Sequence, residues 1–187
     1  ADESTAAPVE LTTSDRMFLS SMGQQSVIAY GATSVGGEIT PAVTVLHGSD
    51  GDNTPLMQNC QYSAMQVAWS PDGNYVAYPV HTAYPEIRIY DVHSGETQTL
   101  IRWDVYTRVS GLSWSFDGRF LAFTQGDAGA ETIWVTSTDG KMLQSIATGL
   151  LPSWAPDGTH ILYAKRGITQ SFGWHLLHID FVETGKE

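Results

Sequence analysis

The sequence predicts an all-β protein, a β-propeller of about four four-stranded blades. Three observations support this prediction. A short phrase recurs three times, with its tryptophans, Trp69, Trp114 and Trp154, 45 and 40 residues apart. Short apolar segments typical of strands flank each copy, and Gly-containing turns separate these segments. Self-similarity at this period is typical of units that bury their faces against one another, and four short strands per unit is the pattern of a propeller blade.

The chain opens with a small, polar and acidic stretch, residues 1–14, which we interpret as an arm. Within it, residues 9–12 alternate between apolar and polar types as a strand does. The chain starts at Ala1 without a methionine and resembles the mature end left after a signal peptide is removed, although a trimmed chain would begin in the same way. We therefore expect an exported protein, located in the periplasm or at an extracytoplasmic membrane surface.

The propeller is expected over 15–187, in units at about 15–62, 63–107, 108–149 and 150–187. The first unit is degenerate: residues 17–20, 27–30 and 42–46 match its first three strands, but the tryptophan is missing. In the three clear units we predict second strands at 75–78, 120–123 and 160–163 and third strands at 87–90, 132–135 and 176–179. Fourth strands are predicted at 97–100 and 142–146 only.

The last unit therefore lacks a fourth strand, and two hypotheses remain open. Residues 9–12 could supply that strand and close the ring, which would remove an exposed sheet edge. Alternatively, the four blades belong to a larger ring that a partner chain or a continuation of the chain completes.

The recurring phrase has residues that build a turn. Pro71 fixes the φ angle of the first turn position, Asp72 can accept bonds from backbone N–H groups, and Gly73 tolerates a positive φ. Phe116 replaces the proline in the third unit, so the turn is less preorganised there. A tryptophan is large and apolar and suits the space between neighbouring blades. We therefore assign a structural, not catalytic, role to Trp69, Asp72, Gly73, Trp114, Asp117, Gly118, Trp154, Asp157 and Gly158.

The phrases VAWSPDGNYVAY, LSWSFDGRFLAF and PSWAPDGTHILYA resemble the repeats of TolB-type β-propellers. Similar repeats occur in the propellers of tricorn-like and prolyl-oligopeptidase-like peptidases. The resemblance implies the propeller fold. Isolated propellers of this superfamily are mostly extracytoplasmic protein-binding scaffolds, whereas the peptidase propellers gate a separate hydrolase domain. The chain departs from the family in having four units where six or more are usual.

Composition and motifs argue against several functions. The chain has 20 acidic and 9 basic residues, a net charge of −11, which disfavours a nucleic-acid partner. It has no apolar run of about 18 residues and so no predicted transmembrane segment. Cys60 is the one cysteine. A nucleophile elbow, a phosphate-binding loop and a zinc-binding His-Glu-x-x-His are all missing from the sequence. We predict a protein that is not an enzyme, with no catalytic residue, metal or cofactor.

Longer, more varied segments are expected at the blade end opposite the Asp-Gly turns, at 80–85, 102–108 and 165–174. They combine basic and aromatic residues, the typical anchors of protein–protein contacts. The alternative is that several of these aromatics pack between blades. The candidate partner-binding residues are Tyr84, Arg102, Trp103, Tyr106, Arg108, Arg166, Phe172 and Trp174.

The expected function is a protein-binding scaffold, an exported accessory subunit that docks onto an envelope or membrane-bound complex of transport, respiration or photosynthesis. Two alternatives stay open. One is a regulatory propeller of a prolyl-oligopeptidase-like or tricorn-like peptidase. The other is a propeller that binds a small ligand or glycan along its axis, around Ser113 and Ser153.

Overall fold

The structure is a computed structural model, which describes residues 67–127 and 129–166 together with the strands at 20–21, 28–30, 33–35, 38–40, 43–46, 53–57 and 172–178. These described residues contain β-strands and turns and no helix. The strands form four antiparallel sheets, one after another along the chain, and one additional hairpin. The predicted all-β class is confirmed.

The first sheet comes from the degenerate unit. Its strands are β1 (Ser20–Ser21), β2 (Ile28–Tyr30), β5 (Val43–Leu46) and β6 (Asn53–Met57), in that spatial order. Two features differ from the prediction: β6 supplies a fourth strand, and a hairpin of β3 (Thr33–Val35) and β4 (Glu38–Thr40) lies between β2 and β5 in the chain.

The remaining sheets follow the three clear repeats. The second contains β7 (Ala68–Trp69), β8 (Tyr75–Val80), β9 (Glu86–Asp91) and β10 (Thr97–Arg102). The third contains β11 (Val109–Trp114), β12 (Phe120–Gln125), β13 (Thr132–Ser137) and β14 (Leu143–Thr148). The fourth contains β15 (Leu150–Trp154), β16 (His160–Arg166) and β17 (Phe172–His178), so it has three strands among the described residues.

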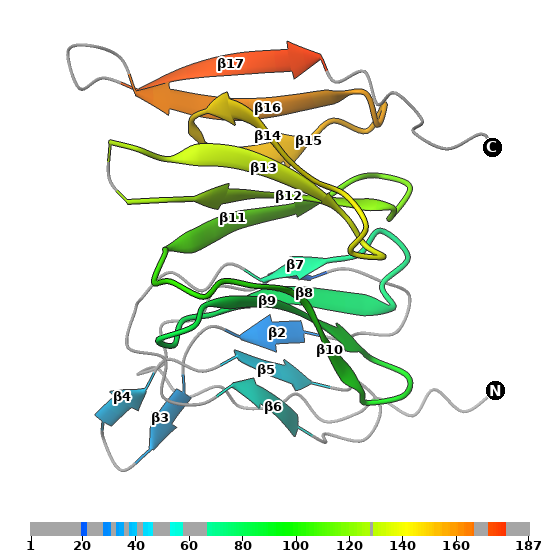
Figure 1. Cartoon of the computed structure of the whole chain (residues 1–187). Helices are drawn as coiled ribbons and strands as arrows, with labels where there is room; N and C mark the ends of the chain where they lie inside the picture. The colour runs from blue at the N-terminus through cyan, green and yellow to red at the C-terminus, as the bar shows by residue number, and fades with distance from the viewer. Residues whose placement is uncertain are drawn as a thin grey trace, which may run out of the picture.

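The sheets stand side by side in chain order, and the first and the fourth lie at opposite ends of the row (Figure 1). The described strands therefore make an open row of blades. Residues 9–12 and 179–187 lie outside the described residues, so the proposed closing strand remains a prediction.

Apolar side chains fill the spaces between neighbouring sheets. One core joins Ala77 and Ile89 of the second sheet to Leu112, Trp114 and other residues of the third. A second joins the third sheet to Trp154 and other residues of the fourth. The predicted position of the tryptophans between blades is confirmed for Trp114 and Trp154.

The Asp-Gly turns form as the sequence predicts. Gly73, Gly118 and Gly158 have φ angles of 72°, 72° and 71°. Oδ1 of Asp72 accepts a hydrogen bond from the backbone N–H of Asn74, and Oδ1 of Asp117 accepts one from that of Arg119, both at 3.1 Å. The turn at Phe116 therefore keeps the geometry of its proline-containing counterpart.

Candidate functional site

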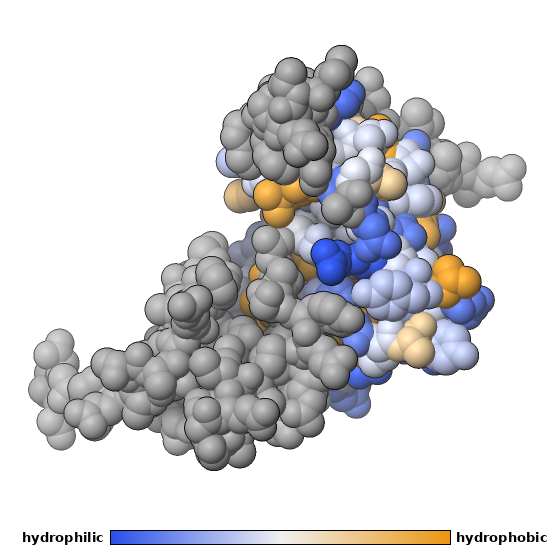
Figure 2. Space-filling view, turned by 90° about the vertical axis from the view of Figure 1, so that its left-hand side faces the viewer, coloured by the Kyte–Doolittle hydropathy of each residue, from blue (hydrophilic) through white to orange (hydrophobic). Residues whose placement is uncertain are grey.

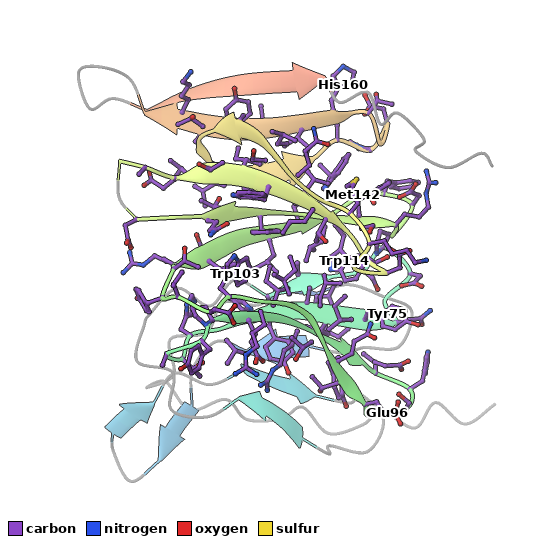
Figure 3. The ribbon with its side chains drawn as sticks, viewed as in Figure 1. Tyr75, Glu96, Trp103, Trp114, Met142 and His160 are labelled. Carbon is purple, nitrogen blue, oxygen red and sulfur yellow. The ribbon has the colours of Figure 1, made fainter. Side chains whose placement is uncertain are left out.

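The described turns and loops lie on two sides of the molecule. The Asp-Gly turns and the turns after the third strands lie on one side, where Tyr75, Glu96, Met142 and His160 are labelled in Figure 3. Residues 81–85, 103–108, 126–127 and 129–131 connect strands on the other side, which we call the loop side; Trp103 marks it. The predicted separation of short turns from longer loops is therefore present in the structure.

The repeated aspartates of the turn side have lowered pKa values because bonds within the turns favour their ionised form. Burial opposes ionisation of Asp72, but bonds from Ser70 and Asn74 outweigh it and hold the pKa below the usual value. The backbone N–H of Thr159 similarly lowers the pKa of Asp157. A general acid at neutral pH needs a raised pKa, so the shifts disfavour that role, and the hydrogen bonds of these carboxylates are made within the turns.

Tyr84 and Arg102 come together on the loop side. The Arg102 guanidinium carbon lies 5.3 Å from the centre of the Tyr84 ring, within the range of a cation–π contact. Tyr84 is 50% exposed, and the side chain of Arg102 is 58% exposed. Thr82 shapes the loop, because its hydroxyl donates to the Tyr84 carbonyl at 2.8 Å. The pair thus presents a planar cation and an aromatic ring to solvent.

Glu86 lies beside Arg102. Its side chain is only 9% exposed and lies opposite Arg102 in the register of β9 and β10. One carboxylate oxygen is 2.6 Å from Nε of Arg88, and the other is 3.7 Å from Nη1 of Arg102. The Thr99 hydroxyl also donates to Glu86, at 3.4 Å. A buried carboxylate needs such partners. The short bond to Nε restrains Arg88, whereas charge attraction alone links Arg102 to Glu86.

The surrounding groups have shifted pKa values with clear causes. Burial disfavours the charge on Arg88, but Glu86 outweighs burial and raises the Arg88 pKa above its usual value. Burial raises the pKa of Tyr78. Burial, with help from the charge on Arg108, lowers the pKa of His81, so its imidazole is neutral at pH 7. At neutral pH the charge of this region comes from its arginines and carboxylates.

The neighbouring loop adds apolar surface. Val105 and Tyr106 are 70% and 52% exposed. Figure 2, which faces the loop side, shows strongly hydrophilic residues close to hydrophobic ones. Exposed aromatic and aliphatic groups beside arginine are the composition of interface centres.

Trp103 packs inward from the loop side. It is half-buried, packs against the core between the second and third sheets, and meets Phe123 edge to face at 5.9 Å between ring centres. Its backbone N–H donates to the Pro85 carbonyl at 3.0 Å, which joins the two loops. This is the packing between blades that we kept as the alternative, and the role of Trp103 in partner binding stays a prediction.

The other candidates divide between loop and strand. Arg108 is exposed and directly precedes β11. Arg102 ends β10, Arg166 ends β16, and Phe172 and Trp174 lie in β17, so none of these four is in a loop. This difference arises because β16 and β17 extend their pairing to Arg166 and Phe172. The side chains of Arg166, Phe172 and Trp174 lie outside the described residues.

Two contributors were missed by the sequence analysis. Glu86 lies between the segment at 80–85 and the predicted strand at 87–90 and was given no role, since nothing in the sequence signals that it is buried between arginines. Val105 follows Asp104 in a short irregular stretch, where its exposure depends on how the loop turns. In the described part of the chain, no group of three or more His, Cys, Asp or Glu residues could hold a metal ion. Nor do these residues form a helix with the length and apolarity to cross a membrane.

Comparisons with known proteins identify the fold. No protein-family model and no curated protein sequence matches the chain. Among solved structures, TolB from Acinetobacter baumannii matches with a TM-score of 0.58 and 18% identity, over 77% of this chain and 36% of that one. A putative TolB from Agrobacterium tumefaciens matches with a TM-score of 0.60 and 20% identity, over 82% and 57% of the two chains.

The β-propeller domain of the Trilobed protease from Pyrococcus furiosus is similar to the same degree. Its TM-score is 0.59 at 18% identity, over 86% of this chain and 53% of that one. The chain thus spans about a third to under three fifths of the structures it matches. These likenesses confirm the β-propeller fold and the structural similarity to TolB-like propellers.

Proposed function

We propose that this protein is a non-enzymatic scaffold that binds a protein partner through the loop side of its second blade. The observation that carries the proposal is the Tyr84–Arg102 pair, exposed to solvent yet restrained by the buried carboxylate of Glu86. Val105 and Tyr106 extend the surface with apolar area.

The physical argument rests on preorganisation. A long arginine side chain loses rotamer freedom when it binds, and this loss weakens association. Stacking on Tyr84 and attraction to Glu86 restrict Arg102 before a partner arrives. The guanidinium has five N–H donors, and the contact with Glu86 at 3.7 Å is too long to be a direct hydrogen bond. Donors therefore remain for a partner's carboxylate or carbonyl groups.

The proposed setting is the periplasm or an extracytoplasmic membrane surface, where the protein would be an accessory subunit of an envelope or membrane-bound complex. The structural similarity to TolB-like propellers supports this setting. Cell fractionation of the source organism tests it: we expect the protein in the periplasmic or membrane fraction, and recovery from the cytoplasm would contradict it.

The contact surface is tested by co-purification of the tagged protein from its source organism, with mass spectrometry of the bound proteins. We compare the wild type with Tyr84→Ala and Arg102→Lys. Lysine keeps the charge but loses the planar, stacking group. Each change should lower recovery of the specific partner about tenfold, while the circular dichroism spectrum stays the same.

The matched control is Phe116→Ala, because Phe116 is also an exposed aromatic, at 67%, but lies in an Asp-Gly turn. Its partner recovery should equal that of the wild type. Equal losses in all three variants would contradict a site on the loop side. If a hydrolase were captured instead of a membrane-complex subunit, the peptidase-propeller alternative would replace the accessory-subunit proposal.

A further inference from the structure

Arg102 differs from Arg88 in how its side-chain donors are used. Arg88 donates from Nε to the Glu86 carboxylate at 2.6 Å. Arg102 lies opposite Glu86 in the register of β9 and β10, but its Nη1 is 3.7 Å from that carboxylate, beyond the range of a hydrogen bond. The contact of its guanidinium with the Tyr84 ring is a cation–π contact and uses no hydrogen-bond acceptor. Within the described part of the chain, the Arg102 side chain is therefore restrained while its N–H donors remain available.

The charges around Arg102 do not balance. The guanidinium groups of Arg88 and Arg102 share the single carboxylate of Glu86. Arg88 has the shorter contact, so a positive charge remains at Arg102 without a counter-ion of its own. Asp104 is the acidic residue of the adjoining loop; it is exposed and forms no ion pair with a described residue. A local excess of positive charge on a chain with a net charge of −11 favours an anionic group at this place.

A partner that covers Arg102 makes this imbalance costly. The centre of an interface excludes water, and a guanidinium that loses its water without gaining a counter-ion carries a desolvation penalty. Glu86 is already committed, because its carboxylate accepts from Arg88 at 2.6 Å and from the Thr99 hydroxyl at 3.4 Å. The negative group therefore has to come from the partner. A carboxylate fits best, since its two oxygens accept two parallel N–H bonds of a guanidinium, whereas a peptide carbonyl brings no charge.

Exposed apolar groups lie next to this guanidinium. Tyr84 is 50% exposed, and Val105 and Tyr106 on the adjoining loop are 70% and 52% exposed. The hydrogen bond from the Trp103 N–H to the Pro85 carbonyl joins this loop to the one that holds Tyr84. A segment that brings a carboxylate to Arg102 thus has apolar surface to cover beside it, as interface centres do.

We propose, on the basis of the contact surface proposed above, that the partner docks with an acidic segment in which an Asp or Glu side chain accepts two N–H groups of Arg102. An apolar residue next to that acid in the partner covers Tyr84 and Val105. Arg102 then determines specificity, because its planar donors distinguish a carboxylate from the neutral amide of the same shape.

Titration of the full chain with short peptides tests this preference, followed by the backbone amide NMR signals of residues 81–85 and 103–108. The probes are the acetylated and amidated tripeptides Phe-Glu-Phe and Phe-Gln-Phe, which differ only in the carboxylate. We expect the dissociation constant of Phe-Glu-Phe to be about tenfold lower. Equal dissociation constants, or signals that shift only outside these two loops, would overturn the proposal.

A third probe separates a side chain from a chain end as the source of the carboxylate. It is acetylated Phe-Gln-Phe with a free C-terminal carboxylate. We expect it to bind as weakly as its amidated form, because its carboxylate does not occupy the place of the central side chain. If it bound tightly while Phe-Glu-Phe did not, the recognised group would be a chain terminus and the acidic-segment proposal would be wrong.

Arg102→Lys keeps the charge but loses the planar pair of donors, so the preference for Phe-Glu-Phe should fall to within about threefold. The matched control is Arg119→Lys. Arg119 is 68% exposed, but it lies on the turn side, where Asp117 already binds it at 2.6 Å. Its variant should keep the full preference. A preference that survives Arg102→Lys, or one that Arg119→Lys abolishes, would contradict recognition by Arg102.

The tripeptide titration and the co-purification can fail independently. If the tripeptides bound equally while Tyr84→Ala and Arg102→Lys still lost the captured partner, the contact surface would stand and the acidic-segment proposal would be overturned. If Phe-Glu-Phe were preferred but neither variant changed which proteins are captured, recognition of a carboxylate by Arg102 would be supported and the scaffold function would be overturned.

Discussion

At the scale of single residues, the first strands of the third and fourth sheets contain equivalent bulges. The register shifts between Ser110 and Ser113 in β11 and between Leu150 and Ser153 in β15. The bulged residues are in the left-handed region, Gly111 with φ of 62° and Leu151 with φ of 55°. An L side chain is disfavoured there, so glycine is the suitable residue and leucine is strained.

A side chain at Gly111 should therefore be destabilising. A Cβ at this position would lie 3.1 Å from Oγ1 of Thr124, 3.2 Å from Cδ of Pro152 and 3.3 Å from the backbone of Leu151. We expect Gly111→Ala to lower the free energy of unfolding by about 2 kcal/mol, from both strain and crowding. Urea denaturation at a fixed protein concentration measures the change.

Gly95→Ala provides the control for Gly111→Ala. Gly95 also has a positive φ, 74°, but a Cβ there would meet no atom within 4 Å. Gly95→Ala should lower the free energy of unfolding by about 1 kcal/mol, from conformational strain alone. If the two variants lost the same stability, the close contacts around Gly111 would have no energetic weight.

Residue roles were predictable where local chemistry determines them. Asp72 and Gly73 form the turn that their side chains favour, independently of the rest of the fold. The roles of Glu86 and Trp103 depend instead on residues that are distant in the sequence, across the sheet for Glu86 and between blades for Trp103. A glutamate near a strand end is usually solvated, and a tryptophan beside Arg102 suggested a binding anchor. Only the tertiary arrangement shows that one is buried between arginines and the other against Phe123.

At the scale of the elements, each junction between sheets depends on one large residue of a first strand. Trp114 sits in the core between the second and third sheets and donates its indole N–H to the Ala68 carbonyl. Trp114→Phe removes that donor, leaves the buried carbonyl without this bond, and opens a small cavity. We expect a loss of about 2 kcal/mol in the free energy of unfolding, measured by urea denaturation.

Trp134→Phe is the control for Trp114→Phe. Trp134 is half-buried at the margin of the same core, so the change removes an indole without affecting the bond to Ala68. It should cost less than about 1 kcal/mol. If Trp134→Phe lowered the free energy of unfolding more than Trp114→Phe does, packing at the margin of the core would determine stability here and not the hydrogen bond from Trp114 to Ala68.

The strands themselves were predictable where the repeat is intact. Short apolar runs after the Asp-Gly turns locate β8, β12 and β16, and β8 and β12 are mostly apolar because they are buried on both faces of their sheets. The first unit was harder. The recurring phrase does not precede β6 or the hairpin of β3 and β4. A local sequence pattern also does not show which strands pair with each other across a sheet. The extension of β16 to Arg166 depends likewise on its partner β17.

At the scale of the whole molecule, the blades form a nearly one-dimensional array. In such arrays each unit gains stability from its own strands and from its contacts with the neighbouring units. The third sheet contributes to an apolar core on each of its two faces, one shared with the second sheet and one with the fourth. The fourth sheet shares a core on one face, and Leu162 on its other face is 40% exposed.

Hydrogen exchange should therefore differ between equivalent strands of these two sheets. In dilute protein, amides of β12 at Leu121, Ala122 and Phe123, whose side chains are fully buried, should exchange about tenfold or more slowly than amides of β16 at Ile161 and Leu162. The reason is that the fourth sheet can open by breaking one junction, whereas the third must break two. Equal exchange in both strands would show that the blades unfold as one cooperative unit.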